Sequence, residues 1–111
     1  MKYALLIYGE KSHAGRSDDE RKVFEREYLA INEVPGIFGG AQLHPVAMST
    51  TVRIEDGQTL LTDGPFIEAK EYLGGFYLFE ADNLDAATEV AARIPAARIG
   101  GAVEIRPLVE R

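Results

Sequence analysis

The sequence contains no cysteine, and this absence removes several kinds of chemistry at once. Disulfide bonds, thiolate metal sites and a cysteine nucleophile all need a residue that the chain does not have. Proteins of reducing compartments commonly lack disulfides, so we expect a cytoplasmic protein.

Long apolar runs are also missing. No segment of the sequence approaches the ~18 to 20 consecutive apolar residues that a membrane-spanning helix needs. The first residues, MKYALLIYGEKSH, have neither an apolar core of signal-peptide length nor a small-residue cleavage site. We therefore expect no membrane partner and no leader peptide.

Positive charge is scarce. The chain has 12 lysines and arginines against 18 acidic residues, which gives a formal net charge of −6. The basic residues form no cluster, and a negatively charged chain repels a phosphate backbone. Nucleic acid is therefore not an expected partner.

Motifs for metals and nucleotides are incomplete. Neither histidine, His13 or His44, has a second histidine or a carboxylate at the spacing of metal ligands. Gly36, Gly39 and Gly40 lack the lysine and serine that would complete a phosphate loop. We expect no metal and no cofactor.

What the chain does contain is the composition of one globular domain. Hydrophobic residues make up 46% and charged residues 27% of the sequence, close to the globular average. A length of 111 residues is enough for one hydrophobic core but not for two, so a single domain over 1–111 is expected.

Three segments have the pattern of strands in a sheet. Residues 3–8 (YALLIY) are apolar at every position, which is typical of a strand covered on both faces. Residues 73–80 (LGGFYLFE) show little polar alternation, with Phe76 and Leu78 on one face and Tyr77 on the other. Residues 102–109 alternate apolar with charged side chains, which predicts a half-exposed last strand.

Two segments have helical periodicity. Ser17 and Glu20 form a capping box at the start of the first, and Asp82 or Asn83 caps the second, which ends before Pro95. Apolar side chains recur at helical spacing in both, namely Val23, Phe24, Tyr28, Ile31 and Val34, then Leu84, Ala87, Val90, Ala91 and Ile94. Residues 36–45 between the first helix and the next strand are expected to form a loop.

A β-hairpin is predicted around Asp56-Gly57, because both turn residues can take positive φ. A two-residue turn places Glu55, Arg53 and Thr51 opposite Gln58, Leu60 and Thr62. Alternation then puts Arg53 on one face of the hairpin. The other face carries Val52, Ile54, Leu61 and Asp63.

The order strand, helix, hairpin, strand, helix, strand predicts an α+β fold of the ferredoxin-like sandwich kind, an antiparallel sheet with two helices on one face. The strands at 3–8 and 73–80 are nevertheless apolar on both faces, and no further segment is left to cover the second face. A homodimer formed by sheet-face packing, with any cavity between the two sheets, is therefore expected.

The segment TDGPFIEAKEYLGGFYLFEA at 62–81 resembles the DGPF motif of one branch of the YCII-related (YciI-like) family. LLIYG at 5–9, TTVR at 50–53 and VEIRP at 103–107 are similar to the same family in the same order. The resemblance implies a single YCII-related/DGPF domain and a ferredoxin-like fold that pairs as a dimeric α/β barrel. That superfamily includes isomerases, monooxygenases and lyases acting on small molecules. YciI-like relatives use a His and Asp pair, but the first helix here has no histidine, so that chemistry is not transferred.

Asp63 and Lys70 are the candidate catalytic residues. Asp63 either accepts backbone N–H groups in a turn before Gly64-Pro65 or serves as a general base on the cavity side of the hairpin. Lys70 either lies in a solvated loop with Glu68 and Glu71 or pairs with Asp63 or a ligand carboxylate.

Five further residues are candidates for ligand binding, namely Tyr8, Arg53, Glu68, Glu71 and Tyr77. The arginine suits an anionic ligand, although an ion pair with a neighbouring acid is the simpler interpretation. Gly74-Gly75 indicates a bulge, a close backbone approach or room for a ligand.

Two functions remain open. The first is a cofactor-independent enzyme that catalyses an isomerisation or an elimination on a small organic molecule. Asp63 would act as base or orienting acid, and Lys70 would stabilise negative charge. The second is a non-catalytic ligand-binding or regulatory module. An unidentified small molecule is the expected partner in both.

Overall fold

The computed structural model describes residues 1–9, 16–66, 69 and 71–111. The elements along the chain are β1 (Lys2–Tyr8), α1 (Asp18–Ile31), β2 (Ile37–Gln42), the short 3-10 helix η2 (Val46–Met48), β3 (Thr50–Glu55), β4 (Gln58–Asp63), β5 (Leu73–Glu80), α2 (Leu84–Ala92), the 3-10 helix η3 (Pro95–Ala97) and β6 (Ala102–Pro107).

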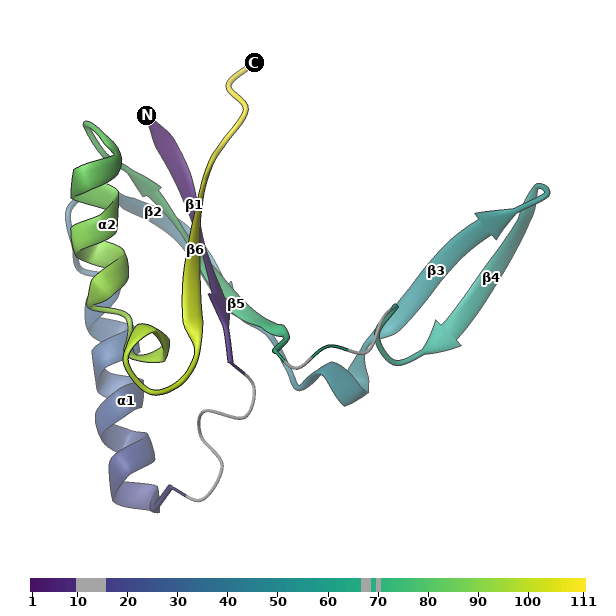
Figure 1. The fold of residues 1–111 in the computed structure, drawn as a ribbon, viewed down its shortest axis with the longest axis horizontal. Coiled ribbons are helices and arrows are strands. Elements are labelled where there is room, and N and C mark those ends of the chain that lie inside the picture. Colours follow the sequence, from purple (N-terminus) through teal and green to yellow (C-terminus); the bar gives the residue numbers. More distant parts are fainter. Residues whose placement is uncertain (10–15, 67–68, 70) are drawn as a thin grey trace.

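Four strands form one antiparallel sheet in the order β2-β5-β1-β6. Both helices lie on the same face of this sheet (Figure 1). The predicted ferredoxin-like α+β fold is therefore confirmed, although its strands are not all the expected ones.

The core lies between the sheet and the helices. In β1 and β5 every second side chain faces the helices and is buried, as Tyr3, Leu5, Tyr77 and Phe79 show. The alternate residues Phe76 and Leu78 face the other side, as predicted, and are only half-buried. The remaining core side chains come mainly from the helices and the turn after α2, namely Ile31, Ala87, Val90, Ile94 and Ala96.

The prediction that Val23 and Leu84 lie on the buried faces of their helices is wrong. Val23 is 44% exposed and Leu84 is 55% exposed. On α1 the inward positions are Tyr28 and Ile31. Val23 lies five residues before Tyr28, a spacing that turns it away from that line of side chains.

The predicted start signals of both helices are confirmed. The Ser17 Oγ accepts from the Glu20 N–H at 3.2 Å, and the Glu20 carboxylate accepts from the Ser17 N–H at 3.4 Å. At α2 the cap is Asn83 rather than Asp82, and its side chain accepts from the Ala86 N–H at 2.9 Å. Each helix thus begins where a side chain satisfies a backbone donor.

The loop predicted over 36–45 is wrong, because Ile37–Gln42 is the edge strand β2 and pairs with β5. Its register shifts between Ile37 and Gly39, which displaces Phe38 from regular alternation. Gly40 has φ +152, and a Cβ there would lie 2.5 Å from the Phe76 carbonyl oxygen. The glycines that suggested a loop therefore allow two strands to approach closely.

The predicted hairpin has the expected turn and register. Asp56 and Gly57 have φ +50 and +77, and Arg53 lies opposite Leu60. The hairpin does not join the main sheet, however. It forms a separate two-stranded sheet that projects from the body of the molecule (Figure 1), so the position expected for it in the sheet belongs to β2. We call Thr50–Asp63 the β3–β4 arm.

Candidate functional site

A cleft of about 880 Å³ opens beside the end of the sheet. It is lined by α1, by the ends of β1, β2 and β5, and by residues 43–46, which follow β2. This volume falls in the range of about 300 to 1,000 Å³ that is typical of small-molecule sites.

Several glycines lie in the lining of the cleft. Gly40, Gly74 and Gly75 all line it, and none contributes a side chain to fill it. A Cβ at Gly75 would lie 2.8 Å from the Ala41 carbonyl oxygen, whereas one at Gly74 would meet only the Ile7 carbonyl oxygen at 3.9 Å. The register of β1 and β5 shifts at this point. The bulge and close approach predicted at Gly74-Gly75 are therefore confirmed, and they lie at the cleft.

Two tyrosines on the helix side of the cleft are held as neutral phenols. The Tyr77 hydroxyl donates to the Tyr28 carbonyl oxygen at 2.6 Å. Burial, followed by repulsion from Tyr28 once that phenol ionises, raises the pKa of Tyr77 to about 12, and burial also raises the pKa of Tyr28. Both side chains therefore stay protonated at neutral pH, where they can form hydrogen bonds but not serve as bases.

The rim of the cleft is more polar than its interior. Arg21 and Glu25 reach it from α1, and Gln42 and His44 reach it from the end of β2 and the following segment. All four are exposed, and Arg21 lies 3.8 Å from the Asp18 carboxylate. A ligand in the cleft would thus contact aromatic rings and glycines inside and polar groups at the mouth.

Of the seven predicted site residues, Tyr8 and Tyr77 line the cleft. Tyr77 is only 7% exposed and is tied to α1, as described above. The Tyr8 hydroxyl donates to Glu104 Oε1 at 3.4 Å. The structure thus brings these two tyrosines to one cleft from adjacent strands.

Arg53 and Asp63 lie on the β3–β4 arm and do not line that cleft. The Arg53 guanidinium is 3.3 Å from the Glu55 carboxylate and stacks 5.0 Å from the centre of the Phe66 ring. The ion pair with a neighbouring acid, the simpler interpretation of this arginine, is therefore present.

Asp63 is the last residue of β4 and is exposed. The backbone beside it is held by two hydrogen bonds, from the Thr51 hydroxyl to the Gly64 carbonyl oxygen at 2.8 Å and from the Gly64 N–H to the Ser49 carbonyl oxygen at 2.7 Å. Within the part of the chain that the structure describes, the Asp63 carboxylate accepts no hydrogen bond. The turn after β4 is therefore held by hydrogen bonds of Thr51, Ser49 and Gly64 rather than by the Asp63 carboxylate.

The remaining predictions concern residues around 68–71. Glu71 is exposed and precedes Tyr72, which lines the cleft. Glu68 and Lys70 lie outside the described residues, so the pairing of Lys70 with Asp63 stays a prediction.

Sequence reasoning missed His44, Gln42 and Tyr72 as cleft residues. The sequence around His44 shows no metal-ligand spacing, and the absence of that spacing says nothing about contact with a ligand in a cleft. The useful signal is its position just after a glycine-containing strand. That signal is visible only once residues 37–42 are identified as β2.

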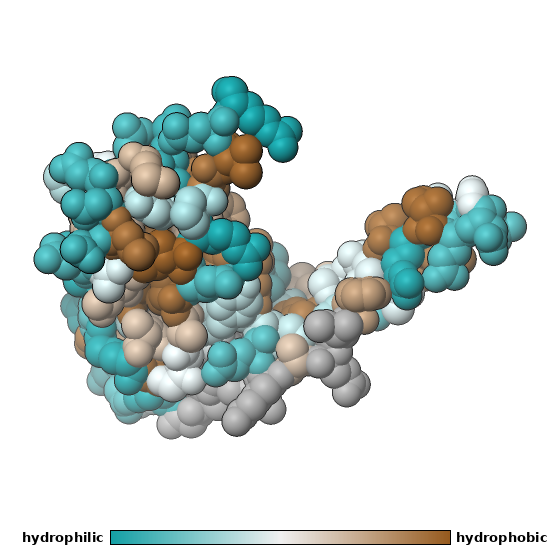
Figure 2. All heavy atoms as spheres, turned by 45° about the horizontal axis from the view of Figure 1, so that its top comes forward, coloured by the Kyte–Doolittle hydropathy of each residue, from teal (hydrophilic) through white to brown (hydrophobic). Residues whose placement is uncertain are grey.

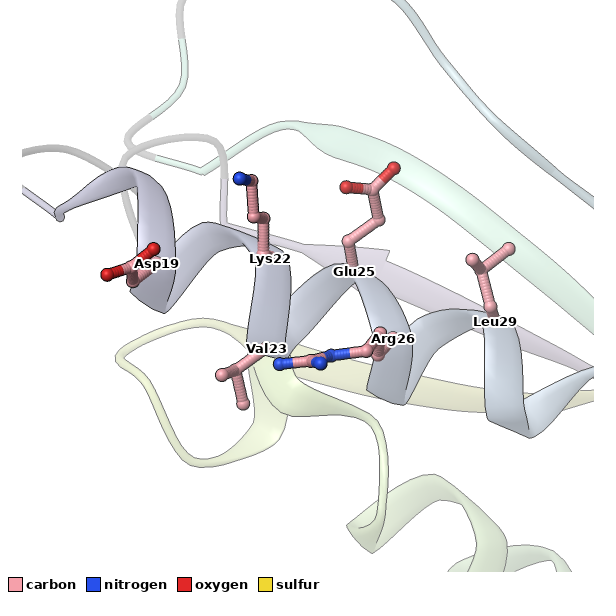
Figure 3. Close-up of a pocket in the computed structure, with 6 residues that line it drawn as sticks. All are labelled: Asp19, Lys22, Val23, Glu25, Arg26 and Leu29. Carbon is pink, nitrogen blue, oxygen red and sulfur yellow. The ribbon is translucent and has the colours of Figure 1, made fainter.

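A second hollow, of about 550 Å³, lies on α1 (Figure 3). All its lining residues come from this helix, and Figure 3 shows Lys22, Glu25 and Leu29 pointing to one side and Val23 and Arg26 to the other. A surface formed by one helix does not enclose a ligand, so we do not assign it a site.

Among the described residues, no three or more His, Asp or Glu side chains lie close enough together to hold a metal ion. In the same part of the chain, none of the helices has the length and apolarity to cross a membrane.

Comparison with known proteins gives a consistent result. The family model of the YCII-related domain matches residues 1–111. An uncharacterised protein of Rhizobium meliloti (strain 1021) is 34% identical over an alignment 117 residues long, which includes 97% of this chain and 92% of the relative.

Proposed function

Since the chain belongs to the YCII-related family, we propose that it is a homodimeric protein that binds a small organic molecule in the cleft beside α1. The observation that carries this proposal is the cleft itself, whose lining includes glycines and tyrosines. No charged side chain of the described residues is buried in it or elsewhere. Its interior therefore favours an uncharged part of a ligand.

The lining indicates the class of ligand. Tyr8, Tyr72 and Phe76 offer aromatic surface, on which planar rings pack well. Gln42, Asn32 and His44 add hydrogen-bonding groups. A planar, largely apolar molecule with one or two polar substituents matches this arrangement.

Binding without chemistry is the function that the geometry supports best. The buried hydroxyls of the cleft are neutral phenols, and Asp63 lies on the arm rather than beside them. The acid–base role of Asp63 with Lys70, the cytoplasmic location and the DGPF branch suggested by residues 63–66 remain predictions.

The homodimer is proposed from the face of the sheet opposite the helices. Leu6, Phe76 and Leu78 on that face are half-buried, and Phe38 is 49% exposed. An apolar sheet face of this kind is stabilised when a second apolar surface covers it.

A thermal-shift screen of planar aromatic acids, phenols and amides tests ligand binding. A compound present at about a hundred times its Kd adds about 2.7 kcal/mol to the free energy of unfolding, which raises Tm by roughly 10 to 20 °C for a domain of this size.

Gly74→Leu is expected to abolish the shift, because it adds a side chain at the cleft where a Cβ has open space around it. Gly74→Ala, which adds one carbon in ordinary contact, is the matched control and should retain most of the shift. A panel without any stabilising compound, or compounds that stabilise Gly74→Leu equally, would contradict a ligand site in this cleft.

A further inference from the structure

The two faces of the β3–β4 arm differ in chemistry. One face carries Val52, Ile54 and Leu61, which are 59%, 64% and 68% exposed. The opposite face carries Arg53 and Glu55, joined by an ion pair. Figure 2 shows hydrophobic residues gathered along one side of the projecting arm.

An arm of this kind is poorly stabilised in a single chain. A lone two-stranded hairpin is marginal in water unless its apolar face packs on something else. Within the described residues nothing covers Val52, Ile54 and Leu61. A contiguous exposed apolar patch of this kind is typical of an interaction site.

The same chain also has an uncovered apolar surface, the sheet face opposite the helices. This open sheet face presents Leu6, Phe38, Phe76 and Leu78. Charged side chains lie at its margin, since the Lys2 ammonium is 5.7 Å from the centre of the Phe38 ring. The arm and the open sheet face therefore both expose apolar side chains, and both belong to one chain.

We infer that the β3–β4 arm is a dimerisation arm whose apolar face lies on the open sheet face of a second copy of this chain. Two-fold symmetry makes the contact reciprocal, so each arm covers the partner's sheet. The inference rests on the proposed homodimer and adds to it the segment that makes the contact.

The dimensions are compatible with this arrangement. Each strand of the arm has six residues, and six residues in extended conformation span about 20 Å. Four strands spaced about 4.8 Å apart span roughly 15 Å from the first axis to the last. One arm is thus long enough to cross the whole sheet.

The area required also favours the arm. A stable interface buries about 800 Å² on each partner. Leu6, Phe76 and Leu78 are already half-buried within their own sheet, so they offer only part of that area. The arm adds three apolar side chains that are about two-thirds exposed, namely Val52, Ile54 and Leu61.

The arrangement has a consequence for Asp63. It pairs with Thr50, two residues before Val52, and therefore shares the apolar face of the arm. In the dimer this carboxylate would turn toward the partner's sheet rather than toward its own cleft. The sequence likewise predicts that Asp63 lies on the side of a cavity between the two sheets of a dimer.

Leu61→Lys tests the inference by sedimentation equilibrium. Because Leu61 is exposed in the single chain, the charge should leave the far-UV circular dichroism unchanged but weaken dimerisation at least tenfold. Leu60→Lys is the matched control, since Leu60 is the neighbouring residue on the opposite face and is 40% exposed, and it should remain dimeric. A monomeric wild type would refute the homodimer together with the arm contact. A dimeric wild type with an equally dimeric Leu61→Lys would refute the arm contact alone.

Photo-crosslinking locates the contact independently, and the absence of native cysteine makes single labelling sites available. Benzophenone attached to Thr59→Cys, opposite Ile54 on the apolar face, should crosslink to β1 or β5 of the other chain. Gln58→Cys, one residue away on the opposite face, should give little crosslinked dimer. Mixing isotopically labelled and unlabelled chains separates crosslinks between chains from those within one. Crosslinks only within a chain, or equal yields from both positions, would overturn the inference.

Discussion

At the scale of single residues, Tyr77 belongs both to the lining of the cleft and to the hydrophobic core. Tyr77 is part of the hydrophobic core, yet its hydroxyl reaches the backbone of α1 at Tyr28. A buried hydroxyl of this kind needs a hydrogen-bond partner, and the Tyr28 carbonyl oxygen provides one. The same bond holds α1 over the end of β5, where the cleft lies.

The raised pKa of Tyr77 predicts a loss of stability in alkali. Its folded pKa of about 12 exceeds the ordinary value near 10, so the folded state binds more protons between these pH values. The associated stability is fully present below about pH 10 and is lost as the pH rises toward 12, by at most about 3 kcal/mol. Urea unfolding across this range should show a smaller decline for Tyr77→Phe. A decline identical to that of the wild type would contradict the assignment.

Gly74 and Gly75 should respond differently to the same substitution. Gly75→Ala places a Cβ 2.8 Å from the Ala41 carbonyl oxygen, so β2 and β5 must separate. We expect it to lower the free energy of unfolding by about 1 to 3 kcal/mol, the usual cost of overpacking. Gly74→Ala has no close neighbour and should change stability by less than about 1 kcal/mol. Equal effects in urea titrations would show that the strands do not approach as closely as described.

At the scale of elements, α1 combines a complete cap at its start with a narrow buried face. Ile31 is its only buried residue among those described, whereas the capping box satisfies two backbone donors at its start. Hydrogen bonds from Ser17 lower the pKa of Glu20 below its usual value. The contribution of this carboxylate is therefore present above its usual pKa and is lost as the pH falls through the lowered value.

Ser17→Ala should destabilise the protein by about 1 kcal/mol, because the Glu20 N–H loses its side-chain acceptor. Ser17→Asp keeps an acceptor at the same position and should retain most of the stability. Urea unfolding followed by circular dichroism measures both variants. A loss as large for aspartate as for alanine would argue against a capping role.

At the scale of the whole molecule, two features have opposite effects on the proposed association of two chains. Apolar surface stabilises it, whereas the negative net charge of each chain opposes it. In the proposed dimer the apolar arm and the open sheet face would be covered, but each chain carries a formal net charge of −6. Association of two such chains brings like charges together, and added salt screens this repulsion.

The proposed dimer should therefore become tighter as salt increases. The Debye length falls from about 30 Å at 0.01 M to about 8 Å at 0.15 M ionic strength, so repulsion between chains is largely screened at the higher value. Sedimentation equilibrium at both salt concentrations measures the change in Kd. Weaker association at higher salt would indicate an interface held by ion pairs instead of the apolar arm.

Local features of the fold followed from residues close together in the chain. The capping box joins Ser17 to Glu20, the turn at Asp56-Gly57 sets the hairpin register, and alternation in β6 separates Val103 from Glu104. Each of these rests on backbone angles or hydrogen bonds within a few positions, so the order of residues alone specifies them.

The larger arrangement depended on contacts between distant segments. Residues 37–42 resemble a loop until β5, more than thirty residues later, provides the edge with which they pair. The hairpin has the pattern of a sheet strand pair, yet β2 occupies the place beside β5 and leaves the arm outside. The cleft lies where Gly40 of β2 approaches Phe76 and where Gly75 of β5 approaches Ala41, and no pattern within either segment contains the other. Local interactions thus specified every α-helix and strand except β2, whereas pairing between distant strands decided that element, the arrangement of the sheet and the location of the cleft.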